Sequence, residues 1–266
     1  MTQVHFIGAG QMAEAIVRAS LSAGTLRAEA VSLEDIDAAR VGLLHQRYQL
    51  GERNSTQALS NASLVVLGIR PQDDLAAVAK RVRPLLAPGA TVVSLIAGVT
   101  LETLEALFGT DTPIARVIPN TLTDTGFGYS GVVLNAHARS EQVDPFLTGF
   151  GKVLYLPESQ IDIFTGFGIA GPNYIYYFIE SFTDAGVLAG LSRAQASEVV
   201  LENLLGSVAM LRHSQKHPRQ LLDINNSPAG VGMHGLYELN NSDFAAGLQR
   251  SVLAAVKRTR ELGAGE

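Results

Sequence analysis

Cysteine is absent from this chain of 266 residues, and so is any long uninterrupted block of lysine and arginine. Without cysteine the protein has no disulfide, no thiolate nucleophile and no cysteine-based metal site. The 20 lysines and arginines are outnumbered by 25 aspartates and glutamates, which gives a formal net charge of −5. Nucleic acid binding requires a basic surface, so we expect no nucleic acid partner.

Long hydrophobic runs are also missing, because glycine, proline or a charge interrupts each apolar stretch well before membrane-spanning length. The first residues, MTQVHFIGAG, contain neither a cationic segment nor a cleavable apolar run. We therefore expect a soluble cytoplasmic protein without a membrane partner. With 47% hydrophobic and 17% charged residues, the chain is long enough for one large folded domain or two smaller ones.

Short β-branched runs alternate with amphipathic segments along the first part of the chain. The runs predict strands, and apolar residues at helical spacing between them predict helices. The expected strands cover residues 4–8, 30–33, 64–69, 90–98 and 114–119, with two further edge strands at 129–134 and 153–156. The expected helices include one that ends near Leu21, one at 36–48, one from Pro71 and one at 101–108. This alternation is typical of an α/β fold with a doubly wound parallel sheet.

The pattern changes after Pro157. Apolar residues recur at helical spacing over 160–190 and 192–212, and strand-like alternation disappears. We therefore predict a nucleotide-binding domain at 1–157 and an all-helical domain at 158–266. Small side chains in the second domain let helices approach one another closely; they include Gly186, Ala189 and Gly190.

A glycine-rich loop follows the first expected strand, in the segment VHFIGAGQMAEAI. Gly8 and Gly10 allow a tight turn and a close approach of the backbone to a ligand, and Ala13 is small where the next helix meets the strand. A dinucleotide's pyrophosphate is expected on the free N–H groups at the start of that helix, at Gln11 and Met12. A turn with a purely structural role is the alternative.

Acidic residues end the second expected strand, in the segment VSLEDID. Glu34 lies about 20 residues beyond the glycine loop, where an acid accepts hydrogen bonds from the hydroxyls of an unphosphorylated ribose. A 2′-phosphate needs a cation instead, and Arg40 lies at least a turn into the next helix. The sequence thus favours NADH over NADPH. Alternatively, Glu34 and Asp35 simply cap the helix at 36–48.

In motifs spread from end to end, the chain resembles the pyrroline-5-carboxylate reductase family. These motifs agree in order and spacing: IGAGQMAEAI near the start, GIRPQ at 68–72, SLIAGVT at 94–100, RVIPNT at 116–121, GPNYIYYFIESFTDAGVLAGLSR at 171–193, HPRQLLD at 217–223 and NSPAG at 226–230. The resemblance implies a Rossmann-type domain followed by a helical dimerisation domain, and thus a homodimer or higher homo-oligomer. It also implies NAD(P)H-dependent reduction of a small cyclic imine carboxylate, most directly 1-pyrroline-5-carboxylate to L-proline.

The resemblance also assigns roles to the glycine-rich stretch NSPAGVGMHG at 226–235. In the family, backbone N–H groups of this loop hold the substrate carboxylate, and a threonine lies beside the reacting imine. The matching cradle here contains Ser227 and the N–H groups of Ala229, Gly230 and Val231. Gly232 stands at the threonine position.

His234 lies in the same stretch and is a candidate proton donor, although loop histidines more often pack or form hydrogen bonds. His213 and His217 have the spacing of metal ligands. Pro218 ends that helix and no carboxylate accompanies the pair, so we expect no metal site.

Further cofactor contacts are expected in loops that follow strands, where ligands bind in open α/β folds. The resemblance places Arg70 and Pro71 on the adenosine side, and a proline that starts a helix is the alternative. Ala97 and Gly98 belong to the family motif SLIAGVT and are assigned to the cofactor on that basis. Asn120 either meets the nicotinamide or its ribose, or caps a turn.

Two family hydroxyls are missing, since Gly232 replaces the threonine and Ala170 replaces a serine; Leu222 also replaces a lysine. One hydrogen bond typically contributes about 1–3 kcal/mol in a transition state, so its loss need not abolish turnover. The alternatives are a reductase for a different imine and a dinucleotide-binding protein with a regulatory, non-enzymatic role. A hydroxyacid dehydrogenase ranks last, because the only lysines after Pro157 are Lys216 and Lys257, both late.

Overall fold

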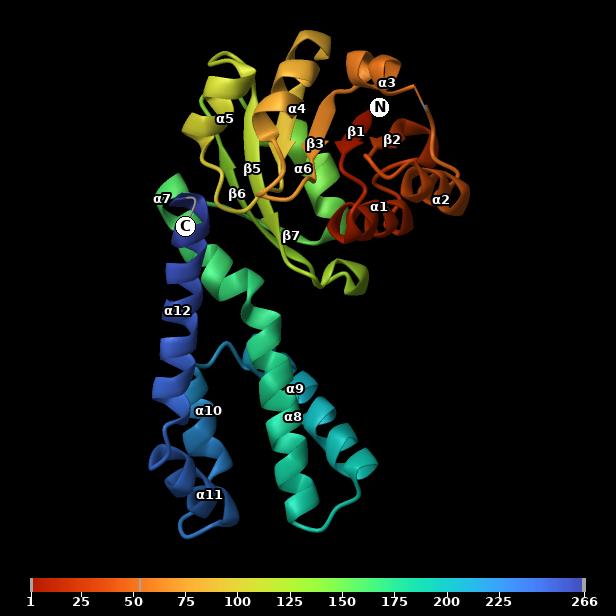
Figure 1. The fold of residues 1–266 in the computed structure, drawn as a ribbon. Helices are drawn as coiled ribbons and strands as arrows, with labels where there is room; N and C mark the ends of the chain where they lie inside the picture. The colour runs from red at the N-terminus through yellow and green to blue at the C-terminus, as the bar shows by residue number, and fades with distance from the viewer. Residues whose placement is uncertain (1, 53, 265–266) are drawn as a thin grey trace. The chain divides into compact units, whose positions relative to one another are not determined.

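The structure, a computed structural model, describes residues 2–52 and 54–264 (Figure 1). Its contacts divide the chain into two compact units. The first unit contains Met1–Ala170 and Ala254–Glu266, and the second contains Gly171–Leu253. This grouping by contacts differs from the predicted domains 1–157 and 158–266 in the segments 158–170 and 254–266. The domain boundary itself stays a prediction.

A seven-stranded sheet forms the centre of the first unit. Its order is β2-β1-β3-β4-β5-β6-β7, and every neighbouring pair is parallel except β5 and β6. The strands are β1 (Val4–Ile7), β2 (Val31–Glu34), β3 (Leu64–Leu67), β4 (Thr91–Ser94), β5 (Ile114–Pro119), β6 (Tyr129–Leu134) and β7 (Lys152–Tyr155). The predicted α/β fold is thus confirmed, and both additional strands extend the sheet beyond β5.

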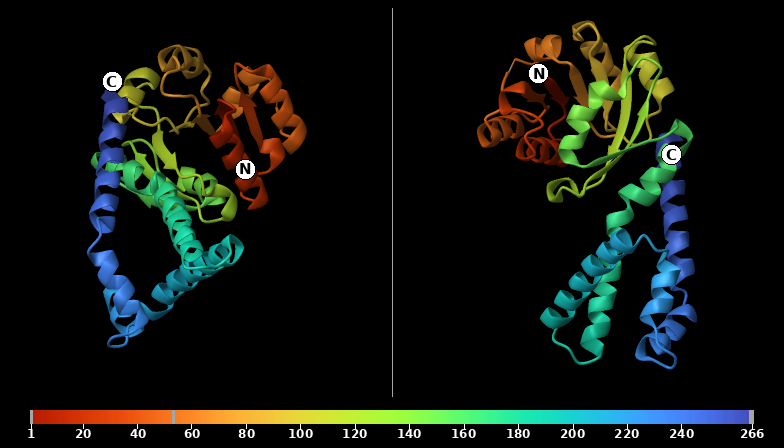
Figure 2. Two further views of the ribbon diagram at one scale, coloured as in Figure 1. Left: turned by 60° about the horizontal axis from the view of Figure 1, so that its bottom comes forward. Right: turned by 180° about the vertical axis from the view of Figure 1, so that it is seen from behind.

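Helices cover both faces of the sheet (Figures 1 and 2). They are α1 (Gln11–Ser22), α2 (Ala38–Tyr48), α3 (Ser55–Asn61), α4 (Leu75–Val82), α5 (Leu101–Phe108) and α6 (Ser140–Leu147). Side chains that alternate along the strands pack into two hydrophobic cores, one on each face of the sheet. Phe6 belongs to the same core as Ile16 of α1, and Val65 belongs to the other core with Leu104 of α5. This two-sided burial explains why the strands read as almost continuous apolar runs.

Helix α4 starts later than predicted. Pro71 lies in a turn in which the Asp73 N–H donates to the Arg70 carbonyl at 3.0 Å. The helix begins only at Leu75, because the Asp74 side chain caps it by accepting from the Ala77 N–H at 2.9 Å. The interpretation of Pro71 as a helix-starting proline is therefore wrong.

The sheet order creates a crevice beside β1. The chain leaves β1 for β2 on one side and reaches β3 on the other, so the loops after β1 and β3 diverge. At this point Gly8 has a φ of +103°, and an added Cβ would lie 2.6 Å from the Gly68 carbonyl oxygen. Only glycine fits there, and the two backbones can therefore lie against each other at the carboxyl edge of the sheet.

The buried Glu14 connects α1 to α2. Its carboxylate accepts hydrogen bonds from Arg40, from Arg47 at 2.6 Å and from the Tyr48 hydroxyl at 2.8 Å. Burial alone raises the pKa of Glu14, but the hydrogen bonds from Tyr48, Arg40 and Arg47 lower it to about 2. Arg40 also donates to the Ala9 carbonyl at 2.9 Å. The network around Glu14 therefore holds the backbone of the glycine-rich loop in place.

We expect Glu14→Gln to lower the free energy of unfolding at pH 7 by about 1–3 kcal/mol, since it removes a charged acceptor from three donors. The pKa of Glu14 is about 2 in the folded protein against an ordinary value of 4.5. Its stabilising effect is therefore complete above pH 4.5 and is lost as the pH falls towards 2. Urea denaturation at several pH values checks this. A difference between wild type and variant that stays constant from pH 7 to about pH 2.5 would contradict it.

After β7 the chain is helical. Helix α7 (Glu158–Phe164) leads through a π-helical segment (Thr165–Ile169) to α8 (Gly171–Leu188), α9 (Arg193–Ser214), α10 (Pro218–Asn225), α11 (Val231–Asn240) and α12 (Phe244–Ala264). The predicted all-helical second region is confirmed. None of the helices in the described part of the chain is long and apolar enough to cross a membrane.

The second unit buries few of its own residues. Only Pro172, Thr183, Ala196 and Val200 are buried between residues 171 and 253. Large apolar side chains are exposed on every helix of the unit, among them Tyr177, Leu188, Leu205, Ile224 and Val231. Apolar surface of this extent is typical of an interaction site.

Candidate functional site

A cavity of about 890 Å³ opens at the carboxyl ends of β1, β2 and β3. Its lining includes Gly8, Gly10, Glu34, Asp35, Arg70 and Arg81. The cavity lies at the point where the strand order reverses, which is where open α/β sheets bind nucleotides. The structure thus brings together four of the residues predicted to bind the cofactor, and Gly68 of β3's loop joins them.

The glycine loop and α1 provide an anion site in this cavity. Gly10 precedes α1 as its N-cap residue and, as a glycine, supplies no side-chain hydrogen bond to the helix. The following residues, Gln11, Met12 and Ala13, form the first turn of α1, whose N–H groups have no acceptor within the helix. A Cβ added at Gly10 would meet no heavy atom within 4 Å, in contrast to Gly8. The fold therefore requires Gly8, whereas the space beside Gly10 is open for a ligand.

Glu34 forms part of the cavity wall at the end of β2. Its carboxylate pairs with the Arg81 guanidinium of α4, and its Oε2 lies 3.7 Å from Nε2 of His5. Burial raises the pKa of Glu34, but His5, Arg81 and Ser55 together lower it to about 2. The group is an ionised acceptor at neutral pH.

Asp35 and Asp37 have separate structural roles. Asp35 accepts from the Ala9 N–H at 2.7 Å and from the Asp37 N–H at 2.9 Å. Asp37 caps α2 by accepting from the N–H groups of Ala39 and Arg40 at 3.0 and 3.1 Å. The alternative in which Glu34 and Asp35 cap this helix is therefore wrong, because the helix begins at Ala38 and Asp37 caps it.

The cavity carries a net negative charge. Of the described residues, five carboxylates line it, from Glu34, Asp35, Asp37, Asp73 and Asp74, against the two guanidiniums of Arg70 and Arg81. Both guanidiniums are already paired, Arg70 with Asp73 at 2.9 Å and Arg81 with Glu34. Arg40 is engaged with Glu14 and the Ala9 carbonyl. Among the residues that the structure describes, the lining therefore offers no unpaired cation to a 2′-phosphate.

The other predicted cofactor residues lie in loops further along the same sheet edge. Ala97 and Gly98 follow β4, and Gly98 has a φ of +80°. The Asn120 side-chain oxygen accepts from the N–H groups of Leu122 and Tyr129 at 3.2 and 3.1 Å, so it caps the turn after β5. The contacts of these residues and of Pro71 with a cofactor stay predictions.

In the second unit, the stretch from Ser227 forms a tight turn that opens α11. The Gly230 N–H donates to the Ser227 carbonyl at 3.0 Å, and Ala229 has a φ of +57°. The N–H of Gly230 is therefore used inside the turn and is not free for an anion, contrary to the expected cradle. Gly230 instead is the N-cap of α11, which leaves the first N–H groups of that helix, beginning with Val231, for a carboxylate.

Gly232 lies against the side chain of Asn226. An added Cβ would lie 2.1 Å from the Asn226 Oδ1, so the amide occupies the space of any side chain at 232. Asn226 is held in place, because its Nδ2 donates to the Leu222 carbonyl at 2.6 Å. At the family's threonine position, the space beside the glycine is thus occupied by the amide of Asn226.

The structure shows the surroundings of two further candidate histidines, His234 and His217. His234 is exposed on α11, and its backbone N–H donates to the Gly230 carbonyl at 3.4 Å. His217 caps α10 by accepting from the Arg219 N–H at 3.2 Å. The described residues contain no group of three or more potential metal ligands. A catalytic role for His234 stays a prediction.

Sequence reasoning missed His5, Ser55 and Arg81, which converge on Glu34. The polar His5 interrupts an otherwise apolar strand, VHFI, and this was the available signal. Arg81 is 47 residues from Glu34 along the chain, so their pairing depends on the fold.

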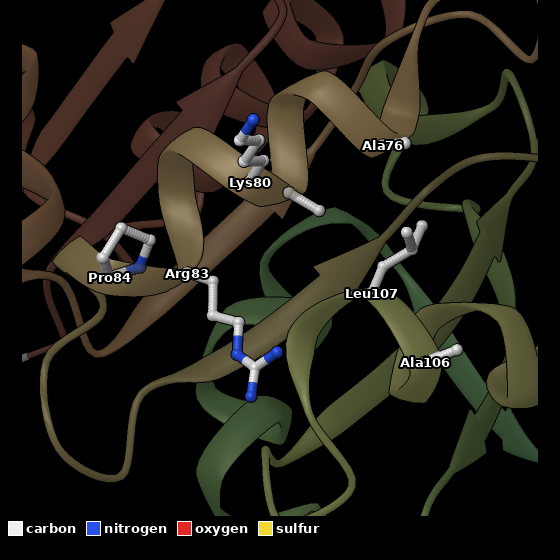
Figure 3. Close-up of a pocket in the computed structure, with 7 residues that line it drawn as sticks. Ala76, Lys80, Arg83, Pro84, Ala106 and Leu107 are labelled. Carbon is white, nitrogen blue, oxygen red and sulfur yellow. The ribbon is translucent and has the colours of Figure 1, made fainter.

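A second hollow lies away from this site, on α4 and α5. It has a volume of about 600 Å³ and is lined by small and basic residues such as Ala76, Lys80, Arg83 and Leu107 (Figure 3). Its described lining residues include no carboxylate and none that also lines the cavity at β1.

The fold and the glycine loop at the β1–β3 crevice define a dinucleotide-binding protein of the Rossmann type. A sequence model described as pyrroline-5-carboxylate reductase dimerisation matches residues 158–262, and one described as NADP oxidoreductase coenzyme F420-dependent matches 3–98. The chain is 33% identical over 268 residues to a pyrroline-5-carboxylate reductase of Synechocystis, with 98% of each chain covered. It is 34% identical to one of Glycine max, over 97% of this chain and 94% of that relative. The chain belongs to the pyrroline-5-carboxylate reductase family.

Solved structures agree. The pyrroline carboxylate reductase of Plasmodium falciparum with NADP bound matches with a TM-score of 0.85 at 27% identity, covering 98% of both chains. The enzyme from Coxiella burnetii matches with a TM-score of 0.88 at 24% identity, which supports the fold alone.

We expect Gly8→Ala to affect mainly the stability of the fold and Gly10→Ala to affect mainly the binding of the dinucleotide. The first adds a Cβ against the Gly68 carbonyl at a positive φ, and should lower the free energy of unfolding by about 2 kcal/mol or more. The second meets no protein atom, and should change stability by less than about 1 kcal/mol while weakening NADH binding about tenfold. Thermal unfolding and calorimetric titration check this. Unchanged NADH affinity of Gly10→Ala would contradict the assignment of the anion site.

We expect Gly232→Ala to lower the free energy of unfolding by about 1–3 kcal/mol, because the new Cβ overlaps the Asn226 amide. Adding Asn226→Ala should restore part of that loss, and a double-mutant cycle should give a coupling of about 1 kcal/mol or more. Additive effects of the two substitutions would show that Asn226 does not occupy the space at 232.

Proposed function

We propose that this protein reduces 1-pyrroline-5-carboxylate to L-proline with a nicotinamide dinucleotide. The observation that carries the proposal is similarity over 98% of both chains to a curated pyrroline-5-carboxylate reductase. The anion site beside Gly10 and the ionised Glu34 support it, because they suit the pyrophosphate and the ribose of such a cofactor.

The nicotinamide ring, when bound, supplies a hydride to the carbon of the C=N bond, and the nitrogen of the protonated imine keeps its proton. The protein's tasks are binding and orientation. The Gly8–Gly10 loop and the first turn of α1 would hold the pyrophosphate, and Glu34 the adenosine ribose. At the substrate, the free N–H groups at the start of α11 and the Ser227 hydroxyl would anchor the carboxylate, which fixes the approach of the imine carbon.

The loss of the family's two hydroxyls at 170 and 232 is compatible with this chemistry. The imine arrives already protonated from water, so the reaction does not need a dedicated acid in the site. Asn226 also brings a polar amide next to Gly232. A preference for another cyclic imine carboxylate remains the second candidate, because these same departures change the polar groups on the loop.

We propose NADH as the preferred cofactor. The described residues of the cavity wall supply five carboxylates against two guanidiniums, and each of these guanidiniums is already paired. A 2′-phosphate would bring about two further negative charges into that field. The Plasmodium falciparum relative was solved with NADP, so the preference is argued from this chain's own residues.

We propose that the protein acts as a homodimer or larger homo-oligomer. The apolar faces of α8 to α11 and the match to the family's dimerisation region support association through the second unit. Light scattering measures the mass directly, and a monomer at micromolar concentration would contradict it. A cytoplasmic location stays an expectation from the sequence.

We expect the purified protein to oxidise NADH in the presence of 1-pyrroline-5-carboxylate, with kcat/KM at least tenfold higher for NADH than for NADPH, a difference of about 1.4 kcal/mol. Absorbance of the reduced nicotinamide follows the reaction. Omission of the imine is the control.

No turnover with either dinucleotide, despite measurable binding, would contradict the proposed reaction. The same assay with other cyclic imine carboxylates then separates a change of substrate from a non-enzymatic role. A preference for NADPH would contradict the cofactor assignment alone.

A further inference from the structure

His5 is a fully buried polar residue in the middle of β1, with 0% of its surface exposed. It lies opposite Ser32 in the register of β1 and β2, and its Nδ1 is 2.9 Å from the Ser32 Oγ. Its neighbours Val4 and Phe6 are apolar core residues, so burial of this imidazole costs solvation that an apolar residue would avoid. Such a residue calls for a physical explanation.

The second ring nitrogen faces the wall of the dinucleotide cavity. Nε2 of His5 is buried without a hydrogen-bond partner and lies 3.7 Å from the Glu34 Oε2. This distance is too long for a hydrogen bond, but a charge and a polar N–H interact strongly across it in a buried environment. A small rotation of the carboxylate would complete the contact.

The structure also sets a preferred tautomer. The Ser32 hydroxyl lies 2.9 Å from Nδ1 of His5 and 3.5 Å from the Val4 carbonyl oxygen; when it donates to the nearer Nδ1, the ring proton is on Nε2, where it points to the Glu34 carboxylate. The opposite tautomer would place a lone pair against a negative charge. The Glu34 carboxylate therefore favours the ring arrangement in which an N–H on Nε2 is directed at it.

We propose that His5 is a positioning residue for cofactor selection: through Glu34, it holds an acceptor towards the adenosine ribose and so favours NADH over NADPH. The inference rests on the proposed function of the cavity. His5 does not line the cavity, so it acts only through Glu34.

Two elements hold the carboxylate from different sides. Arg81 approaches from α4 with 48% of its side chain exposed, whereas His5 approaches from the interior of the sheet. Without His5, Arg81 and Ser55 hold the carboxylate, and it moves closer to the guanidinium that neutralises its charge. Both changes weaken the hydrogen bonds to ribose hydroxyls and reduce the repulsion of a 2′-phosphate.

The test compares dissociation constants of the full-length protein for NADH and NADPH, by calorimetric titration. His5→Phe keeps a buried ring and removes both nitrogens. We expect the ratio of the NADPH to the NADH dissociation constant to fall about three- to tenfold, which is the size of an ordinary net polar contact. The kcat at saturating NADH should stay within about twofold, because His5 does not line the cavity and reaches it only through Glu34.

Three further variants make the result interpretable. Ser32→Ala keeps the imidazole but removes the partner of Nδ1, and should shift the ratio in the same direction by a smaller amount. Val4→Ala removes core packing from the same strand without touching Glu34, and should leave the ratio unchanged. Glu34→Gln should lower the ratio more than any other variant, about tenfold or more.

The outcomes separate the two claims. If Glu34→Gln lowers the ratio and His5→Phe leaves it within the range of Val4→Ala, the positioning role is wrong and the proposed function stands. If Glu34→Gln itself leaves the ratio unchanged, the ribose assignment is wrong as well. Should His5→Phe fail to fold, Ser32→Ala decides, and an unchanged ratio in that variant overturns the inference.

Discussion

The close approach of two backbones at Gly8 and Gly68 is the constraint on which the nucleotide site depends. The Gly8 N–H donates to the Glu34 carbonyl and the Gly68 N–H to the Ile7 carbonyl, each at 2.8 Å, so the ends of β1, β2 and β3 are joined beyond the strands. A side chain at position 8 would separate them. Because this junction is closed, the loop turns directly into α1 and presents the helix's free N–H groups to the crevice.

Electrostatics then decide what the crevice accepts. Arg40 and Asp35 hold the Ala9 peptide from its carbonyl and its N–H, which makes the loop rigid before any ligand binds. Preorganisation of this kind reduces the entropy lost on binding. Arg40, Arg81 and Arg70 are paired with Glu14, Glu34 and Asp73. The anion site is therefore supplied by backbone N–H groups, and the ribose end of the cavity stays acidic.

The strands and the helical second region could be predicted from the sequence, because hydrophobic periodicity is a local signal. The run IARVIP matches β5 in full. Helices α3 and α6 were not predicted, since α3 has seven mostly polar residues and α6 contains Pro145. The glycine loop and Glu34 were found from motif spacing. The partners of Glu34, and the contact of Asn226 with Gly232, come from the tertiary fold or the local turn geometry, which residue type and spacing do not encode.

A crystal structure of the protein with NADH tests the central claim most directly. We predict that the pyrophosphate lies over the first turn of α1 beside Gly10, and that the adenosine ribose hydroxyls lie within hydrogen-bond distance of the Glu34 carboxylate. A dinucleotide bound elsewhere, or a ribose turned away from Glu34, would contradict the account of this site.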